Sequence, residues 1–362
     1  MARKYIRIAD LQSGTKVEAV FLLHNYQQRP KKDGNNFVTM ALKDASGKIT
    51  GVMWDNFAGL TSGSIKENDF VEVSGEVLTY NNQLQFKVSK LVKVSDSEVD
   101  AAFFLPVCPI PVAELEKELL ERIEQIADTD YKALVKSVFD QPMFMERFRR
   151  APSAVTMHQA YLGGLLEHTL CVVRNALKMS DNYPQANRSL LIAGGLLHDI
   201  GKIVEFTYEK KIAYSDAGRL LGHISMGNAM VECHCARLEF PMAKKVLLQH
   251  MILSHHGLME YGSPKCPATL EALILHHADL LDAQLSNFME FAQNAARTGS
   301  RWEYNNMFER HMFGATEIMD DGCDLMREVA HEPPRVEQRR HSPAEAMATA
   351  VSSNELMETL VS

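Results

Sequence analysis

The stretch from Leu196 to Lys202 carries the groups in this sequence that are best suited to chemistry. An apolar run ends in His198 and Asp199, followed after one residue by Gly201 and Lys202. An imidazole nitrogen and a carboxylate oxygen can share one divalent metal ion, and the second oxygen of Asp199 could bridge to another ion. Gly201 permits a sharp turn, and the Lys202 ammonium could hold a phosphate as a point charge. We therefore predict that Asp199 and Lys202 take part in catalysis.

Histidines are concentrated in one third of the chain, since ten of the 14 lie between His158 and His277. One histidine on an apolar helix is usually structural. Here several histidines and two aspartates end or interrupt apolar helices, and a polar group buried without a partner costs roughly 2–7 kcal/mol. A shared metal centre would satisfy all of them together. His234 is predicted to be incidental, and His158 and His250 stay open.

The helices that would position these groups begin after a β-rich region. Short apolar runs with turn signals between them, at Gln27 to Asn35 and at Asp44 to Gly47 for example, predict five strands. Five strands with a helical interruption near residues 57–64 suit a Greek-key barrel of OB type. Such barrels bind single strands by stacking bases on aromatic rings beside cations. The candidates, some of which could instead fill the barrel, are Tyr26, Arg29, Lys31, Lys32, Phe37, Trp54, Tyr80 and Phe86.

The predicted fold class is a multidomain α and β protein, with an N-terminal OB-type β-barrel followed by an all-α domain. The barrel is assigned to residues 1–95 and a linker to residues 96–111. Helical periodicity continues from Val112 to about Phe313, which assigns the helical domain to residues 112–315, with its metal core at residues 158–290. Residues 330–362 are poor in large apolar side chains and are predicted to be a disordered tail.

Charge and composition narrow the class of protein. A net charge of −8 argues against non-specific binding of nucleic acid over the whole surface, so a polyanion would need a local patch or metal ions. The six cysteines form no CxxC pair, which indicates neither a zinc ribbon nor a disulfide framework. No apolar run is long enough to span a bilayer, and no signal peptide is recognised. We expect a cytoplasmic protein without a membrane partner; the sequence leaves homo-oligomerisation open.

The order of these motifs is similar to that of a known superfamily. His168, then His198-Asp199, then Asp279 resembles the HD-domain metal-dependent phosphohydrolases, and the added His223 and His255-His256 resemble their members with two metals. More narrowly, the chain resembles the YhaM family of 3′-5′ exoribonucleases, which also has an N-terminal OB domain. That likeness rests on residues 164–168, 221–224, 252–257, 262–265 and 281–283, and it covers roughly residues 5–295.

The resemblance implies a ligand set for two metal ions. Asp199 would bridge them, and the complete set would be His168, His198, Asp199, His223, His255, His256 and Asp279. Nitrogen and oxygen donors without thiolate suit Mn²⁺, Fe²⁺, Co²⁺ or Ni²⁺, and the family favours Mn²⁺. His276 and Asp282 lie three residues on either side of Asp279, so we expect them to orient a ligand carboxylate. Glu167, beside His168, is the third expected supporting residue.

The leading hypothesis is a 3′-5′ exonuclease that hydrolyses single-stranded RNA, with single-stranded DNA as a further candidate substrate, through a hydroxide activated by two metals. Its 3′-5′ polarity rests on the resemblance alone. One alternative is an HD phosphohydrolase acting on mononucleotides or cyclic nucleotides, against which the OB domain argues. The other is a nucleic-acid-binding module with an inactive HD domain, against which the complete ligand set argues.

Overall fold

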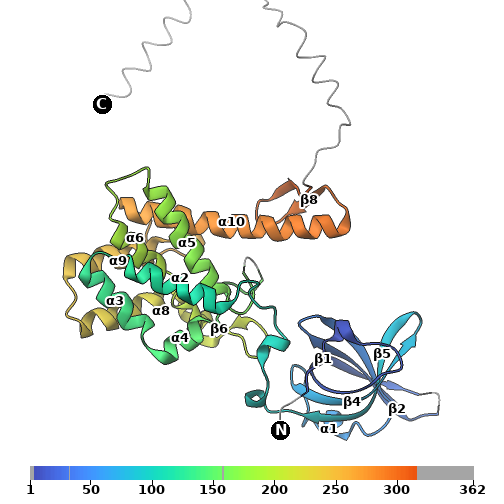
Figure 1. The fold of residues 1–362 in the computed structure, drawn as a ribbon. Helices are drawn as coiled ribbons and strands as arrows, with labels where there is room; N and C mark the ends of the chain where they lie inside the picture. Colours follow the sequence, from blue (N-terminus) through green and yellow to red (C-terminus); the bar gives the residue numbers. More distant parts are fainter. Residues whose placement is uncertain (1–3, 32, 157–158, 316–362) are drawn as a thin grey trace, which may run out of the picture.

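The computed structural model describes residues 4–31, 33–156 and 159–315, which form a β-barrel followed by a helical region (Figure 1). This is the order of the two parts predicted from the sequence. Lys32 and the predicted disordered tail at residues 330–362 lie outside the described residues. Among the helices that the structure describes, none has both the length and the apolar composition needed to cross a membrane.

The barrel is closed by five strands in the order β1-β2-β3-β5-β4. β3 and β5 pair in parallel, and the other pairs are antiparallel. Alternate side chains point inward and form a core that includes Phe21, Leu42, Val73 and Phe86. The strands are β1 (Lys16–Pro30), β2 (Asn36–Asp44), β3 (Gly47–Met53), β4 (Phe70–Tyr80) and β5 (Gln83–Lys93), with the short helices η1 (Ile8–Asp10) and α1 (Ala58–Thr61).

β1 is longer than the sequence suggests. Gln27 to Pro30, read as part of a turn, continue the strand and pair with β2 as far as Asn36. The register of β1 and β2 shifts between Leu23 and Asn25, where a bulge lets the strand bend around the barrel. The predicted turn is therefore confined to the residues after Pro30.

The linker is packed rather than loose. It contains η2 (Asp96–Glu98) and η3 (Ala101–Phe103). Phe104 lies against Phe70 of the barrel, with ring centroids 4.8 Å apart, whereas Leu105 belongs to the core of the helical region. In addition, the Lys210 ammonium lies 3.4 Å from a carboxylate oxygen of Asp69 in the barrel. The two parts are thus joined by apolar and ionic contacts.

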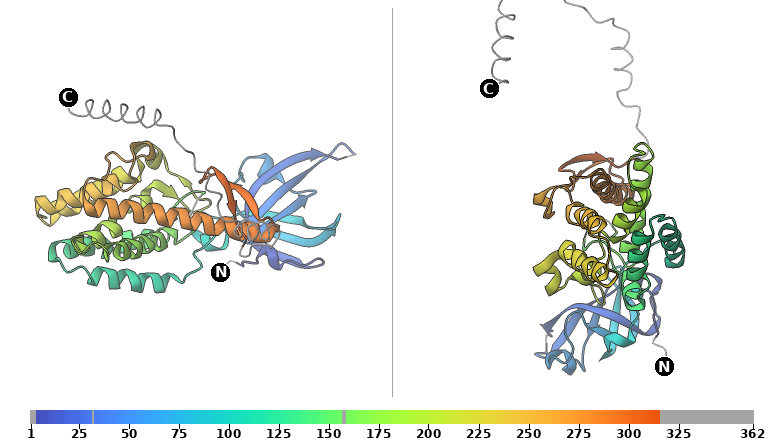
Figure 2. Two further views of the ribbon diagram at one scale, coloured as in Figure 1. Left: turned by 90° about the horizontal axis from the view of Figure 1, so that it is seen from above. Right: turned by 90° about the vertical axis from the view of Figure 1, so that its left-hand side faces the viewer.

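The helical region packs its helices around a core that Figures 1 and 2 show from three sides. Its helices are α2 (Val112–Glu124), α3 (Thr129–Phe139), α4 (Pro142–Phe148), α5 (Gly164–Ser180), α6 (Arg188–Leu197), α7 (Lys202–Glu205), α8 (Asp216–Arg237), α9 (Met242–Ser254), η4 (Met259–Tyr261) and α10 (Leu270–Thr298). Side chains cap several N-termini: Asn187 accepts from Leu190 N on α6, and Thr269 accepts from Ala272 N on α10.

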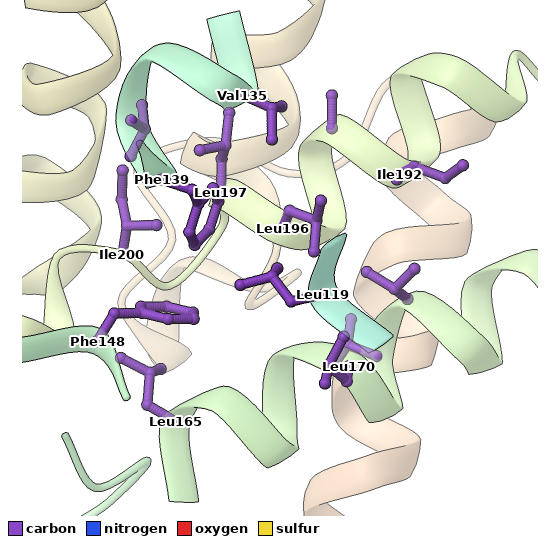
Figure 3. Close-up of a cluster of buried hydrophobic side chains, with 14 of the residues drawn as sticks. Leu119, Val135, Phe139, Phe148, Leu165, Leu170, Ile192, Leu196, Leu197 and Ile200 are labelled. Carbon is purple, nitrogen blue, oxygen red and sulfur yellow. The ribbon is translucent and has the colours of Figure 1, made fainter. Parts of the chain in front are cut away.

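The apolar core fixes the helix ends that carry the candidate ligands (Figure 3). Leu165 and Leu170 flank His168 in sequence, and Leu197 and Ile200 flank the His198-Asp199 pair; all four are fully buried. Because such interiors are close-packed, these neighbours leave the polar side chains between them little freedom to move.

Two short hairpins interrupt the predicted all-helical pattern. β6 (Phe206–Thr207) pairs with β7 (Ala213–Tyr214), and β8 (Trp302–Asn305) pairs with β9 (Arg310–Phe313). The prediction of helix up to Phe313 is therefore wrong after Thr298. Gly299, in the left-handed conformation at φ 71°, ends α10.

Candidate active site

Five helices bring the predicted ligands to one place. His168 lies on α5, His198 caps the C-terminus of α6, and His223 lies on α8 directly after a kink at Gly222. His255 caps the C-terminus of α9, with His256 next to it, and Asp279 lies on α10. Residues more than a hundred positions apart in the chain therefore face one another.

The ligand atoms form two groups on the two sides of Asp199. On one side, Asp199 Oδ2 lies 3.3 Å from His168 Nε2 and 3.3 Å from His198 Nε2, and His168 Nε2 lies 3.1 Å from Asp279 Oδ1. On the other, Asp199 Oδ1 lies 3.4 Å from His223 Nε2 and 3.5 Å from His255 Nε2. The three imidazoles of His223, His255 and His256 form the second group.

Every imidazole in the two groups is oriented by an oxygen at its other nitrogen. Nδ1 lies 2.7 Å from an Asp282 oxygen for His168 and 3.0 Å from a Glu205 oxygen for His223. For the other three imidazoles the partner of Nδ1 is a backbone carbonyl: Gly195 for His198, Ile252 for His255, and Tyr261 for His256. A carbonyl or carboxylate can only accept, so Nδ1 donates and Nε2 turns its lone pair toward the cluster.

These residues fit a pair of divalent metal ions. The Nε2 atoms of His198, His223 and His255 are buried and make no hydrogen bond of normal geometry to any described residue. Two donor atoms that each lie about 2.1 Å from the same ion, with a donor–metal–donor angle near 90–109°, are about 3.0–3.4 Å apart. The separations of the donor atoms on both sides of Asp199 are close to this range. Nitrogen and oxygen donors without a thiolate match the metals expected from the sequence.

Burial and charge set the protonation of the ligands. Burial alone would raise the pKa of Asp199, but Lys202 and the nearby imidazoles outweigh it and hold that pKa well below its usual range. The pKa of Asp279 is likewise lowered, mainly by His168, against the effect of burial. Burial lowers the pKa of His255 and of His256. Burial would also lower the pKa of His168, but Asp199, Asp279 and Asp282 outweigh it and raise that pKa, so His168 must release a proton to bind a metal. Ionised carboxylates and neutral imidazoles are the forms that bind metal.

Lys202 pairs with the central carboxylate. Its ammonium is buried and lies 2.7 Å from Asp199 Oδ2. Burial would lower the pKa of Lys202, but Asp199 and Asp279 raise it, so the side chain is charged. The sequence hypothesis placed this charge on a substrate phosphate; the contact in the structure is with Asp199, and a role toward phosphate stays a prediction.

Gly201 is required for a reason other than the turn expected from the sequence. Its backbone is helical, at φ −64°. A Cβ atom added there would lie 2.0 Å from the His223 carbonyl oxygen and 2.8 Å from Gly227 N. The absence of a side chain lets the backbone of α8 approach α7, which brings His223 to Asp199.

Gly201→Ala is expected to separate α7 from α8 and to move His223 away from Asp199. Overpacking of this kind costs typically about 1–3 kcal/mol of stability, so we expect a lower Tm and weaker Mn²⁺ binding by calorimetry. Gly47→Ala in the barrel is the matched control, because the nearest atom would lie 3.9 Å from its Cβ. A Gly201→Ala protein with wild-type Tm and Mn²⁺ affinity would contradict this packing argument.

The three predicted supporting residues make other contacts than those expected from the sequence. Asp282 orients the imidazole of His168 rather than a ligand carboxylate. His276 donates from Nδ1 to the His255 carbonyl at 2.8 Å, so it supports a ligand through the backbone and not through Asp279. Glu167 accepts hydrogen bonds from Tyr161 and from the Cys108 thiol instead of reaching a ligand.

Two supporting residues were missed from the sequence. Glu205 bonds both the backbone N and Nδ1 of His223, each at 3.0 Å. Gln159, which adopts a positive φ of 50°, donates to Asp282 Oδ2 at 3.1 Å. Glu205 could have been found, since it follows Lys202 by three residues on an apolar helix. No local signal marks Gln159. His234 and His250 lie outside the cluster, bonded to Ser137 and to Ala268 N.

The barrel carries an aromatic and basic surface at its second and third strands. The rings of Phe37 and Trp54 stack with centroids 4.7 Å apart, and the Lys31 ammonium lies 5.7 Å from the Trp54 ring. Trp54 is 44% exposed. It borders a groove of about 770 Å³ whose lining also includes Lys4, Lys16 and Lys87, which sequence reasoning did not select, together with the acidic Glu18, Asp55 and Glu76.

Not every predicted barrel candidate lies on this surface. Phe86 is 0% exposed and packs edge-to-face on Phe21, because it points inward on β5; its assignment to nucleic acid is wrong. Tyr26 packs against the barrel core and donates its hydroxyl to the Leu60 carbonyl. Arg29 pairs across the strands with Phe37, and Tyr80 is exposed near the β4–β5 turn.

Comparison with known proteins decides the family. Two proteins named 3′-5′ exoribonuclease YhaM, from Listeria innocua serovar 6a and Listeria monocytogenes serovar 1/2a, are each 30% identical to this chain over 322 residues. Each match covers 84% of this chain and 99% of the relative. The chain belongs to the YhaM family. The resemblance predicted from the sequence is therefore confirmed.

Two domain families match within this YhaM-family chain. A family described as HD domain matches residues 165–284, which include every predicted metal ligand, and an OB-fold nucleic acid binding domain matches residues 22–94. Together they identify this YhaM-family member as a nucleic-acid hydrolase. Among solved structures, the HD domain of the Listeria monocytogenes phosphodiesterase PgpH is 16% identical, covering 52% of this chain and 94% of that one at a TM-score of 0.29.

Proposed function

We propose that this enzyme shortens single-stranded RNA from its 3′ end by hydrolysing one phosphodiester bond at a time at a centre of two divalent ions, with Mn²⁺ favoured. The observation that carries the proposal is the position of Asp199, whose two oxygens face two separate groups of ligand atoms. Relatives named exoribonuclease and the OB-fold match support RNA as the substrate. Single-stranded DNA is proposed as a second substrate.

The ligand residues would divide between the two ions. His168, His198 and Asp279 would hold one ion, and His223, His255 and His256 the other, with Asp199 shared. When bound, two ions supply Lewis-acid polarisation of the phosphoryl group and a water of lowered pKa as the nucleophile.

The protein's own contribution is to fix these donors and to balance their charge. Asp282 and Glu205 hold two imidazoles in the orientation that presents Nε2. The Lys202 ammonium keeps Asp199 ionised. Two divalent ions with Asp199, Asp279 and the neutral imidazoles leave the ligand shell near +2, which would attract a phosphodiester to a protein of net charge −8.

End-labelled oligonucleotides test the proposal directly. A 5′-labelled 20-nucleotide RNA incubated with the protein and Mn²⁺ should give a ladder that shortens from the 3′ end, and EDTA should stop it. Hydrolysis of mononucleotides or cyclic nucleotides alone would favour the small-molecule alternative. Binding of RNA without cleavage at any metal concentration would identify an inactive binding module.

Trp54→Ala is expected to weaken substrate binding without changing the hydrolytic step. Base–aromatic stacking is worth about 1–3 kcal/mol per base, so we expect KM for RNA to rise at least about fivefold, with kcat within twofold of wild type. Trp54→Phe keeps a ring beside Phe37 and is expected to recover most of the affinity. A KM unchanged in Trp54→Ala would exclude this surface from the path of the strand.

A further inference from the structure

The hairpin of β8 and β9 presents four rings on one of its faces. Trp302 pairs with Phe313 across the strands, and Tyr304 pairs with His311. Because side chains alternate between the two faces of a strand, these four residues point to the same side, which we call the ring face (Trp302, Tyr304, His311 and Phe313). The rings meet in pairs, with centroids 5.2 Å and 5.5 Å apart.

The opposite face of the hairpin holds it to α10. Asn305 is buried and donates from Nδ2 to Asn287 Oδ1 at 2.9 Å, and Glu303 accepts from the Thr298 hydroxyl at 2.9 Å. Gly314, directly after β9, lies so close to α10 that an added Cβ would sit 2.5 Å from Ala295 Cβ. The contacts of this opposite face are therefore enough to hold the hairpin on α10, and they do not involve the four residues of the ring face.

The ring face is open to solvent and is bordered by a cation. Trp302 is 61% exposed and Tyr304 is 53% exposed. The Arg301 guanidinium lies 5.5 Å from the Phe313 ring. Arg310 pairs with Asn305 and lies on the opposite face, where its Nε donates to Met312 Sδ at 3.4 Å. Exposed aromatic patches rimmed by polar groups mark interaction sites, and cations beside flat rings are the combination that binds single-stranded nucleic acid.

We propose that the ring face binds the substrate strand at a distance from the cleaved end, with bases stacked on Trp302 and Tyr304 and a phosphate paired with Arg301. This inference rests on the proposed function. RNA is favoured over a protein partner because the same combination, a pair of rings beside a cation, recurs at Phe37, Trp54 and Lys31 on the barrel. Stacking also tolerates any base, as an exonuclease requires.

The position of the hairpin sets a length requirement. α10 carries Asp279, and the hairpin contacts α10 between Asn287 and Thr298, 8 to 19 residues further along, a rise of about 12–28 Å. A stacked strand at about 3.4 Å per nucleotide needs about four to eight nucleotides to cover that distance. Figures 1 and 2 show the hairpin over the C-terminal part of α10. Only longer strands can therefore reach both the site and the ring face.

The double variant Trp302→Ala/Tyr304→Ala tests this by substrate length. For a 20-nucleotide RNA, we expect Kd by fluorescence anisotropy in EDTA, and KM with Mn²⁺, to rise at least about fivefold. For a two-nucleotide RNA, which is too short to reach the ring face, kcat/KM should stay within twofold of wild type. Tyr183→Ala is the matched control, because Tyr183 is 51% exposed in the loop between α5 and α6. We expect this substitution to change neither the Kd and KM for the long RNA nor kcat/KM for the short one.

A second variant separates a specific contact from a folding defect. Arg301→Ala leaves the rings in place, and the lost phosphate contact should reduce the slope of log Kd against log salt by about 0.7. An unchanged Kd for 20-nucleotide RNA in both variants would overturn the inference even if the wild type degrades RNA. A rise in Kd in the variants would support binding of RNA by the ring face even if the wild type showed no hydrolysis. Absence of hydrolysis would count against the proposed function and not against this inference.

Light scattering tests whether the ring face instead contacts a second copy of the chain. Conversion of a dimer to a monomer in the variants, with RNA affinity unchanged, would assign the ring face to that contact and overturn the inference.

Discussion

Asp199→Asn is expected to lower the rate of RNA hydrolysis about a hundred- to a thousandfold, the scale on which the loss of one electrostatic group of an active site acts, because it removes the charge that both groups of ligand atoms share. Both oxygens of the Asp199 carboxylate lie 3.3–3.5 Å from Nε2 atoms of four imidazoles. An amide is neutral and presents a donor on one side, so it cannot serve both groups. Hydrolysis of labelled RNA and metal content by elemental analysis are the measurements, and retained turnover with bound metal would refute the assignment.

The control for Asp199→Asn must separate chemistry from folding. Removing one partner of a buried ion pair costs about 3–5 kcal/mol, and Lys202 would lose its partner. Asp199→Asn/Lys202→Met removes both charges, and we expect it to recover stability while staying inactive. Asp181→Asn alters an exposed carboxylate that pairs with Arg188 at the surface, and it should leave activity at the wild-type level.

Metal removal is expected to have the second largest effect. EDTA should abolish hydrolysis and lower the Tm of the helical domain, because the buried Nε2 atoms then lose their ligand. Mn²⁺ at a hundred times its Kd stabilises by about 2.7 kcal/mol per site, which corresponds to a Tm increase of roughly 5–10 °C for a domain of this size.

Scanning calorimetry with and without Mn²⁺ measures this effect. The unfolding of the barrel, which contains none of the proposed ligands, should not shift and serves as the internal reference. Asp199→Asn should lose most of the increase in Tm. An Mn²⁺-dependent Tm increase of the same size in Asp199→Asn would show that the metal binds elsewhere.

The sequence predicted the elements that follow from local patterns. Alternation and turn residues are local, so the barrel strands were found, as was the ending of the apolar helices at His198 and His255. Gln27 to Pro30 were assigned to a turn because they are polar, yet an exposed strand can be polar throughout when its partner strand supplies the hydrogen bonds. Similarly, the hairpin after Gly299 was missed because its two strands are only four residues long.

Supporting contacts could not be predicted, because they depend on how helices pack. Asp282 lies on the same helix as Asp279, so spacing suggested that it acts on Asp279; packing of α10 against α5 brings it to His168 instead. Phe86 is indistinguishable from an exposed ring until the inward face of β5 is known. Gln159 reaches Asp282 from 123 residues away, which no spacing rule could indicate.

The contact between α7 and α8 depends on two residues that have no side chain. Gly201 and Gly227 face each other across it, and a Cβ on Gly227 would lie 3.2 Å from Gly201 N. A mutational survey restricted to ionisable residues would find the ligands and overlook both positions. For redesign toward another metal or substrate, the permitted spacing of the two helices is therefore a tighter constraint than the identity of any single donor.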